Sequence, residues 1–127
     1  MSLPFHVHVT AGAPAYKQVL EAVHRALANG QLEPGSAFPS VRELSKGARI
    51  NPSTAHKVVQ HLVSDGVLEV LPGRGTRVCE RRELDPAERL RVLSEFADRL
   101  VVEARRHGLG REDIDAAISA AWRGEKD

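Results

Sequence analysis

The spacing of apolar residues predicts three helices in the first half of the chain. In the stretch 15–29 apolar side chains recur every three or four residues, which is the spacing of one helical face, and Gly30 suits the left-handed position after a helix. The stretches 41–48 and 52–65 repeat this spacing. The residues predicted to turn inward are Tyr16, Val19, Leu20, Val23, Leu27, Val41, Leu44, Ala48, Ala55, Val58, Val59 and Leu62.

Capping signals fix where the second and third of these helices begin. Ser40 and Glu43 form the S-x-x-E pattern of a capping box, in which each side chain accepts a hydrogen bond from the other residue's backbone amide. Asn51 is a strong N-cap, and Pro52 occupies the first helical position, where its missing amide hydrogen costs nothing. Two helices that start so close together are predicted to form a helix-turn-helix.

Two strands are predicted after Gly66, which ends the third helix. Residues 67–71 and 76–79 have strand composition and flank the Pro-Gly-Arg-Gly segment 72–75, whose glycines supply the positive φ values of a hairpin. Two coupled helices and a glycine-tipped basic hairpin outline a winged helix-turn-helix, which is a module for reading DNA. Residues 3–9 also alternate between apolar and polar, which predicts a short edge strand.

A second region begins near residue 80. Residues 80–83 form a charged linker, and the capped start at Asp85, with Pro86 at the first helical position, predicts a long helix to about His107. Two glycines then break the chain, and a shorter helix is predicted over 112–122. The predicted fold is therefore mainly α with a small β wing.

We expect two domains, a winged helix-turn-helix DNA-binding domain at 1–79 and a helical dimerisation tail at 80–127. The tail helices have apolar stripes that a lone hairpin cannot cover, and pairing the same surface across a two-fold axis would bury them. That axis would place two recognition helices on half-sites about 34 to 36 Å apart, or a multiple of this. The residues predicted for dimerisation are Leu90, Leu93, Ala97, Leu100, Ile114, Ile118 and Trp122.

Charge is distributed unevenly between these two regions. The formal net charge is only +1. Residues 1–79 hold eight Lys and Arg against five acids, giving +3, whereas residues 80–127 hold ten against twelve, giving −2. A polyanion responds to the local field of one face rather than to the total. The charge of the first region is therefore compatible with a DNA partner.

Other features limit the class of protein. No run of about 18 apolar residues and no signal-peptide pattern is present, which predicts a cytoplasmic protein without a membrane span. Cys79 is the only cysteine, so an intrachain disulfide and a cysteine-based zinc module are excluded. No catalytic motif is present, and we expect neither enzymatic activity nor a cofactor.

The exposed side of the stretch 52–65 carries the residues expected to contact bases, which are Ser53, His56, Lys57 and Gln60. Lys57 has the chemistry to donate to guanine and Gln60 to pair with adenine, although both are equally suited to phosphate, and an ordinary solvated face is the alternative. Thr54 lies near the helix start, where it suits phosphate binding or simple capping.

Basic residues outside this helix are also DNA candidates. Arg74 at the hairpin tip is expected to enter or straddle the minor groove, with Gly73 permitting close backbone approach. Lys46 and Arg49 are weaker phosphate candidates, balanced against solvated charge.

Two further patterns could indicate a binding site but are also explained by ordinary turn or surface residues. The segment 73–76 contains the glycines of a phosphate loop, but it lacks the strand-loop-helix context and the terminal Lys-Ser/Thr. His6 and His8 share one strand face and would need a third group to bind metal, so surface positions are the simpler explanation. We expect no metal site.

Six motifs follow one another from residue 14 to 78. They are Pro14-x-Tyr16-x-Gln18, Gly30-x-Leu32-x-Pro34-Gly35, Pro39-Ser40-x-Arg42-x-Leu44, Asn51-Pro52-x-Thr54, Leu62-x-x-x-Gly66 and Gly73-x-Gly75-Thr76-x-Val78. In order and in spacing they resemble the GntR family of bacterial transcription regulators, and the short tail resembles its YtrA subfamily. The resemblance implies a homodimer that binds an inverted-repeat operator, usually as a repressor, with the tail as its dimerisation element.

The resemblance also bears on single residues. It implies that Arg42 reaches DNA from the start of the second helix; the alternative is a surface ion pair with Glu43 or another acid, which is worth little. Gly47 and Ala48 depart from the family pattern, which predicts a loose end of that helix, and Val59 replaces a frequent tyrosine.

Two other functions are weighed against regulation through double-stranded DNA. A winged helix that binds a protein partner would need an apolar or acidic exposed face, and a binder of RNA or single strands would need aromatic stacking platforms. A small-molecule effector is possible but unidentified. We expect the tail to be too small to enclose a typical ligand pocket of about 300 to 1,000 Å³ within one subunit.

Overall fold

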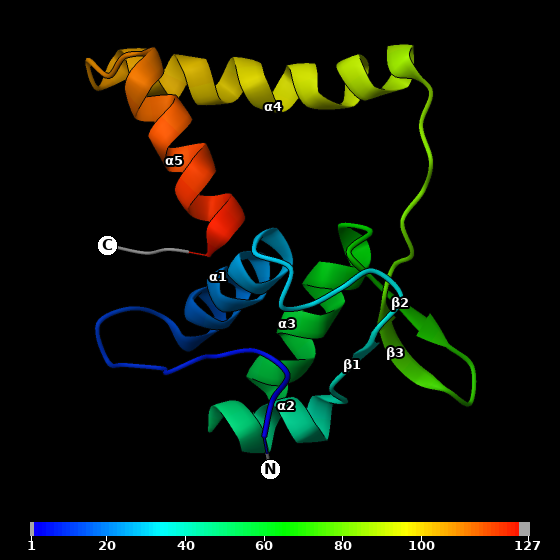
Figure 1. The fold of residues 1–127 in the computed structure, drawn as a ribbon. Helices are drawn as coiled ribbons and strands as arrows, with labels where there is room; N and C mark the ends of the chain where they lie inside the picture. The colour runs from blue at the N-terminus through cyan, green and yellow to red at the C-terminus, as the bar shows by residue number, and fades with distance from the viewer. Residues whose placement is uncertain (1, 125–127) are drawn as a thin grey trace. The chain divides into compact units, whose positions relative to one another are not determined.

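The computed structural model describes residues 2–124 and divides the chain into two compact units, Met1–Arg81 and Arg82–Asp127. The first unit contains α1 (Ala15–Ala28), β1 (Ala37–Phe38), α2 (Val41–Ala48), α3 (Pro52–Ser64), β2 (Leu68–Leu71) and β3 (Gly75–Val78). The second contains α4 (Pro86–Arg106) and α5 (Arg111–Arg123). Figure 1 labels these helices and strands along the ribbon. The predicted mainly α fold with a small β wing is confirmed.

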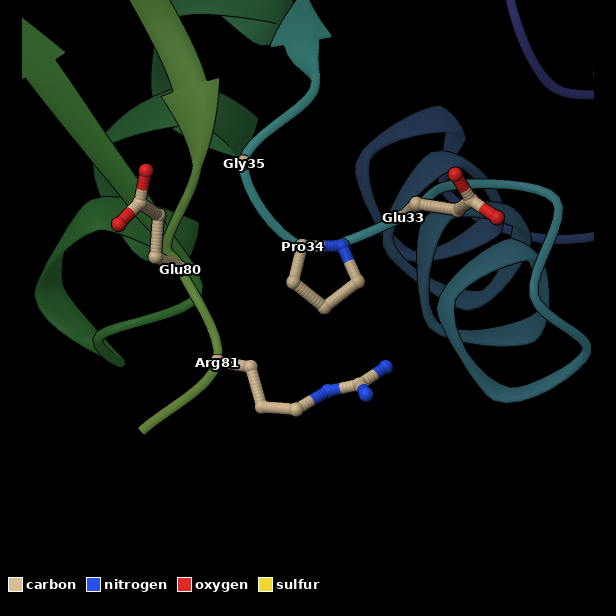
Figure 2. Close-up of a pocket in the computed structure, with 5 residues that line it drawn as sticks. All are labelled: Glu33, Pro34, Gly35, Glu80 and Arg81. Carbon is tan, nitrogen blue, oxygen red and sulfur yellow. The ribbon is translucent and has the colours of Figure 1, made fainter. Parts of the chain in front are cut away.

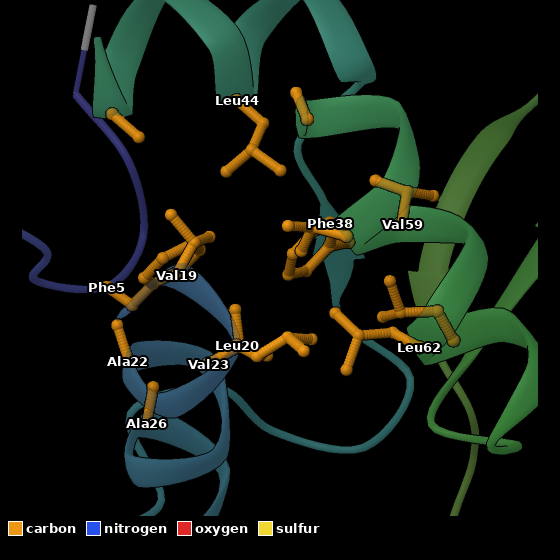
Figure 3. Close-up of a cluster of buried hydrophobic side chains, with 14 of the residues drawn as sticks. Phe5, Val19, Leu20, Ala22, Val23, Ala26, Phe38, Leu44, Val59 and Leu62 are labelled. Atoms are coloured by element: carbon orange, nitrogen blue, oxygen red, sulfur yellow. The ribbon is translucent and has the colours of Figure 1, made fainter. Parts of the chain in front are cut away.

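The first unit is built on one hydrophobic core that joins α1, α2 and α3 (Figure 3). Leu44 of α2 and Leu62 of α3 are fully buried, as is Val23 of α1. These residues occupy the positions that helical spacing predicts, since side chains three and four residues apart share a helix face. The core therefore fixes how α2 and α3 are turned about their axes.

The wing is a three-stranded antiparallel sheet with β3 in the centre. In the β2–β3 hairpin Leu71 pairs with Gly75, and three residues form the turn between them. The two-residue strand β1 adds to the other edge of β3, where Ala37 pairs with Arg77. The hairpin agrees with the sequence prediction, whereas β1 was not predicted.

The strand expected at residues 3–9 is not formed. This segment is extended and its burial alternates as predicted, with Phe5 buried and its neighbours His6 and Pro4 exposed. However, the sheet contains only β1, β3 and β2, so the segment has no strand partner. Phe5 instead stacks on Phe38, with ring centroids 5.8 Å apart. The alternation reflected packing on the core and not pairing in a sheet.

Gln18 ties this segment to α1. Its side-chain amide donates hydrogen bonds to the carbonyl oxygens of Thr10 and Ala13, both at 2.7 Å, and its oxygen accepts one from the Thr10 amide at 2.9 Å. At the other end, Leu3 lies against Gly47 of α2 so closely that an added Cβ atom would meet its side chain at 2.5 Å. Glycine at position 47, which differs from the family pattern, therefore leaves room for the side chain of Leu3 in the N-terminal segment.

The second unit is a helical hairpin that buries little apolar surface by itself. Asp85 and Glu88 form the predicted capping box at the start of α4. After the bend, α5 turns away from α4 (Figure 1), and Ala104 is the only apolar residue of the two helices that is buried within the described chain. Leu93 and Trp122, both predicted for dimerisation, are 63% and 78% exposed. None of the described helices has the length and apolarity to cross a membrane.

We predict that Leu62→Ala lowers the free energy of unfolding of the first unit by about 2 to 5 kcal/mol, because it leaves a cavity beneath α3. The comparison is Val70→Ala on the wing, where the side chain is 60% exposed and the expected change is within about 0.5 kcal/mol. Urea unfolding followed by circular dichroism measures both. Equal losses for the two variants would contradict the assigned core.

Candidate nucleic-acid interface

The start of α2 is held by the capping box that the sequence predicts. The Ser40 hydroxyl accepts a hydrogen bond from the Glu43 amide at 3.1 Å, and a Glu43 carboxylate oxygen accepts one from the Ser40 amide at 3.0 Å. The backbone bond from Ser40, followed by its side chain, holds the pKa of Glu43 below its ordinary value. Glu43 is therefore engaged with the helix start, and Arg42 beside it is exposed.

The turn between α2 and α3 is closed by hydrogen bonds. Arg49 has a left-handed backbone with φ of 56°, a conformation that costs most residues other than glycine about 1 to 2 kcal/mol. The Ile50 amide donates to the Ser45 carbonyl at 3.0 Å, and the Ser45 hydroxyl donates to the Ile50 carbonyl at 2.7 Å. The predicted looseness at Gly47 and Ala48 is not seen, because the end of α2 is bonded and Ala48 is buried.

The N-terminus of α3 is capped as predicted, and its outward side is polar. The Asn51 side chain accepts hydrogen bonds from the amide and the hydroxyl of Ser53, both at 2.8 Å. Thr54 is half-buried beside this cap. The exposed residues of this side of α3 are Ser53, His56, Lys57 and Gln60.

Tyr16 of α1 supports this face, a role that the sequence analysis did not assign. Its hydroxyl forms a 2.8 Å hydrogen bond with Nδ1 of His61, whose Nε2 lies 3.0 Å from Asp65. The Lys57 ammonium lies 5.7 Å from the Tyr16 ring centroid, within the range of a cation–π contact. His61 thus belongs to a half-buried network instead of the open face. The signal available in the sequence was a tyrosine in an apolar stripe, whose hydroxyl needs a polar partner.

The wing turn exposes Arg74. Gly73 and Gly75 have φ of 73° and 82°, and the Arg74 amide donates to the Leu71 carbonyl at 2.9 Å. The strands below are joined by Arg77, whose guanidinium contacts Glu69 at 2.8 Å in a directly opposite pair. The turn is therefore fixed at its base, and its tip carries a solvated cation.

Basic residues at the predicted positions are not engaged with acids. Within residues 2–124, Arg42, Lys46, Arg49 and Arg74 are exposed, and no ion pair of the structure includes them. The alternative pairing of Arg42 with Glu43 is thus not formed. All four, together with the α3 face, belong to the unit Met1–Arg81, at the α2–α3 pair and the hairpin tip. They remain available to a polyanion.

Other candidate chemistry is not assembled in the described chain. Among residues 2–124 no three His, Cys, Asp or Glu side chains gather as metal ligands, so His6 and His8 are not joined by a third ligand. Burial, followed by the neighbouring Glu69 carboxylate, raises the pKa of the Cys79 thiol, which disfavours the nucleophilic thiolate. The structure therefore gives no support to a metal centre or a reactive thiol.

An open recess of about 420 Å³ lies at the end of β3 opposite the wing turn (Figure 2). Its lining combines two carboxylates with one guanidinium, from Glu33, Glu80 and Arg81. Gly35 borders it with φ of 82°, and its amide donates to the Val78 carbonyl at 2.9 Å. The recess marks where β3 leaves the sheet and contains none of the predicted DNA-contacting residues.

Comparison with known proteins gives a consistent result along most of the chain. The family model "Bacterial regulatory proteins, gntR family" matches residues 15–78. The chain is 30% identical over 120 residues to the HTH-type transcriptional repressor YtrA of Bacillus subtilis, covering 91% of this chain and 92% of the repressor.

Two solved structures are similar in fold. YtrA from Sulfolobus acidocaldarius, a GntR-family transcription factor, aligns with a TM-score of 0.59 at 24% identity, over 90% of this chain and 92% of that one. AraR(DBD) in complex with operator ORX1 aligns with a TM-score of 0.53 at 28% identity, over 57% of this chain and 94% of that one. The second similarity is confined to about the length of the first unit.

We predict that Glu43→Gln flattens the acid dependence of stability. The pKa of Glu43 is lowered on folding, so the ionised carboxylate stabilises the fold above its ordinary pKa of 4.5, and this contribution is lost as the pH falls through the lower folded value. Glutamine keeps an acceptor but does not titrate. Urea unfolding between about pH 6 and about pH 3 measures the difference. Glu33→Gln is the control, and equal pH slopes for Glu43→Gln and the parent chain would contradict the assignment.

Proposed function

Because the chain belongs to the GntR family of bacterial regulatory proteins, we propose that it represses transcription as a homodimer bound to an inverted-repeat operator. It is a DNA-binding transcription regulator and not an enzyme, as its relatives are regulators. The observation that carries the proposal is the set of exposed cations around the polar face of α3 and the wing tip, which form no ion pair within residues 2–124. Relatives named as repressors support repression as the direction of this regulation.

We assign α3 as the recognition helix in the major groove. Its N-terminal turns are exposed and polar, and such a helix reads bases from that end. Lys57 is suited to guanine and Gln60 to adenine, with Ser53 and His56 beside them. Thr54 lies at a helix N-terminus, where the dipole and free amides favour a phosphate.

The remaining cations are assigned to the flanks of the site. Arg42 contacts DNA from the first turn of α2, and Arg74 reaches the minor groove with Gly73 beside it. Lys46 and Arg49 lie on α2 and at its end, and we assign both to phosphates. These contacts supply affinity and orientation, whereas α3 supplies most of the sequence preference.

The tail supports the second half of the proposal. Its stripe leaves Leu90, Leu93 and Ile118 exposed in the described chain, and a closed two-fold pairing is the common way to bury such a surface. The other predicted dimerisation residues are Ala97, Leu100, Ile114 and Trp122. We further propose a cytoplasmic location, because the operator would be there.

The two rival functions fit the exposed face less well. A protein-binding winged helix needs apolar or acidic character on α3, but the outward residues there are polar or basic. A single-strand binder needs aromatic platforms. Phe5 and Phe38 are buried and Tyr16 is half-buried, while Phe96 and Trp122 lie in the tail. No aromatic ring is thus placed on the α3 face.

We predict that Arg42→Ala and Lys57→Ala each weaken operator binding about tenfold, since each removes a phosphate or base contact. Fluorescence anisotropy on a palindrome from the promoter of the protein's own gene measures this, and the dependence of affinity on salt should become less steep for a lost phosphate contact. Arg91→Ala, on an exposed position of α4, is the control. Unchanged affinity for both variants, or binding insensitive to salt, would argue against the DNA interface.

We predict that Leu93→Glu converts the dimer to monomers, because it buries a charge in an apolar interface. Sedimentation analysis measures the mass, and affinity for the full palindrome should fall to that for a half-site. Val102→Glu is the matched control. Val102 is 64% exposed and lies about 180° around α4 from Leu93. A monomeric parent chain would refute the dimer while leaving half-site binding intact.

A further inference from the structure

The apolar stripe of α5 becomes more exposed along the helix. Ile114, near the bend, is half-buried, Ile118 is 49% exposed and Trp122 is 78% exposed. These residues are four apart and share a face. Among the described residues, the largest apolar side chain of the hairpin is thus the most exposed one, which is unusual for an indole ring outside a binding surface.

The bend between α4 and α5 contains a pocket with apolar walls, which could receive an apolar side chain. Its volume is about 360 Å³, and it is partly open to solvent. This volume is at the lower end of the range of ligand pockets, and the pocket is not enclosed by one chain. Val101, Ala104 and Leu109 are among the apolar residues of its lining, and Arg105 and Arg111 supply charge.

Trp122 cannot fill the pocket of its own chain. Ile114 lines the pocket, and Trp122 lies eight residues further along α5, which corresponds to about 12 Å along the helix axis. The indole is therefore directed to surface well away from the bend. A second copy of the chain can supply the missing contact if its α5 runs in the opposite direction.

Antiparallel pairing about the middle of α5 brings these two features together. A two-fold axis near Ala117 and Ile118 places Trp122 opposite Asp113 and Ile114 of the other copy, at the edge of that copy's pocket. Small residues around this midpoint allow the helices to approach closely. They are Ala117 and Ala121, which lie on the same side of α5 as Ile118.

The charged residues at the two ends of α5 also favour antiparallel pairing of the two α5 helices. The first turn of α5 contains Glu112 and Asp113 next to Arg111, which is paired with Asp115 at 3.1 Å, and its last turn contains Arg123. Antiparallel pairing places opposite charges beside each other at both ends, whereas parallel pairing would place like charges together. The helix dipoles are also opposed in the antiparallel arrangement.

We propose that Trp122 of each copy docks into the bend pocket of the other, so that the two α5 helices pair antiparallel and the indole anchors the dimer. This inference rests on the homodimer of the proposed function and adds its direction and its central contact. The pocket gives the ring apolar walls, and Arg105 offers a cation at its rim. Buried tryptophans of this kind dominate the affinity of many interfaces.

The single tryptophan of the chain makes the contact directly observable. We expect the emission of Trp122 to shift to shorter wavelength, and its quenching by iodide to fall, as the full chain is concentrated through the dimerisation range found by sedimentation. Trp122→Ala should weaken dimerisation by about thirtyfold or more. Val102→Ala, on the side of α4 opposite Leu93, should leave both the emission shift of Trp122 and the dimerisation affinity unchanged.

The outcomes separate this inference from the dimer itself. A chain that dimerises while Trp122 keeps a solvent-exposed emission overturns the docking and leaves the homodimer in place. A chain that stays monomeric at all concentrations overturns both. A shift to shorter wavelength in a monomer also overturns the docking, because it would place the ring within its own chain.

Cross-linking tests the direction of the helices with the tryptophan intact. In a Cys79→Ser background, Glu112→Cys and Arg123→Cys are introduced together and each alone, and a short bis-maleimide is added. We expect a covalent dimer for the double variant and little for either single variant. Efficient cross-linking of Arg123→Cys alone would indicate parallel helices and overturn the proposal. Sedimentation of each variant before cross-linking confirms that it still dimerises.

Discussion

The burial of α2 and α3 against α1 is the contact on which the rest of the first unit depends. Leu44 and Leu62 are fully enclosed in it, and an apolar stripe admits only one rotation of each helix about its axis. Once that rotation is fixed, Lys57 and Gln60 point outward and the first turn of α2 lies at the surface. The packing that buries the apolar faces of α2 and α3 thus also orients their polar side chains toward solvent.

Much of this could be foreseen because the information is local. The capping box at Ser40 and the proline after Asn51 give helix starts that match the structure. The glycine pair of the wing turn is equally local, since positive φ is a property of one residue. What failed depends on contacts distant in sequence. The segment 3–9 has the alternation of a strand but finds no edge, and the strand at Ala37 exists only through its pairing with β3.

The same division applies to the candidate site. Periodicity was sufficient to select the exposed face of α3, but it gives no reason to separate His61 from that face. In the structure His61 is instead hydrogen-bonded to Tyr16, which is 45 residues away in the chain. No pattern of spacing reports such a pair, although an unpaired tyrosine hydroxyl signals that some partner exists. Likewise, the pocket at the α4–α5 bend arises from how two helices diverge, and a linear apolar pattern carries no measure of that angle.

The left-handed backbone at Arg49 has a consequence for attempts to make this protein more robust. Glycine adopts that conformation freely, so selection for heat resistance alone would tend to replace the arginine. The guanidinium would be lost with it, and it is one of the exposed cations that we assign to phosphate contacts. Position 49 is therefore a place where a screen for folding and a screen for regulation in the cell would favour different amino acids.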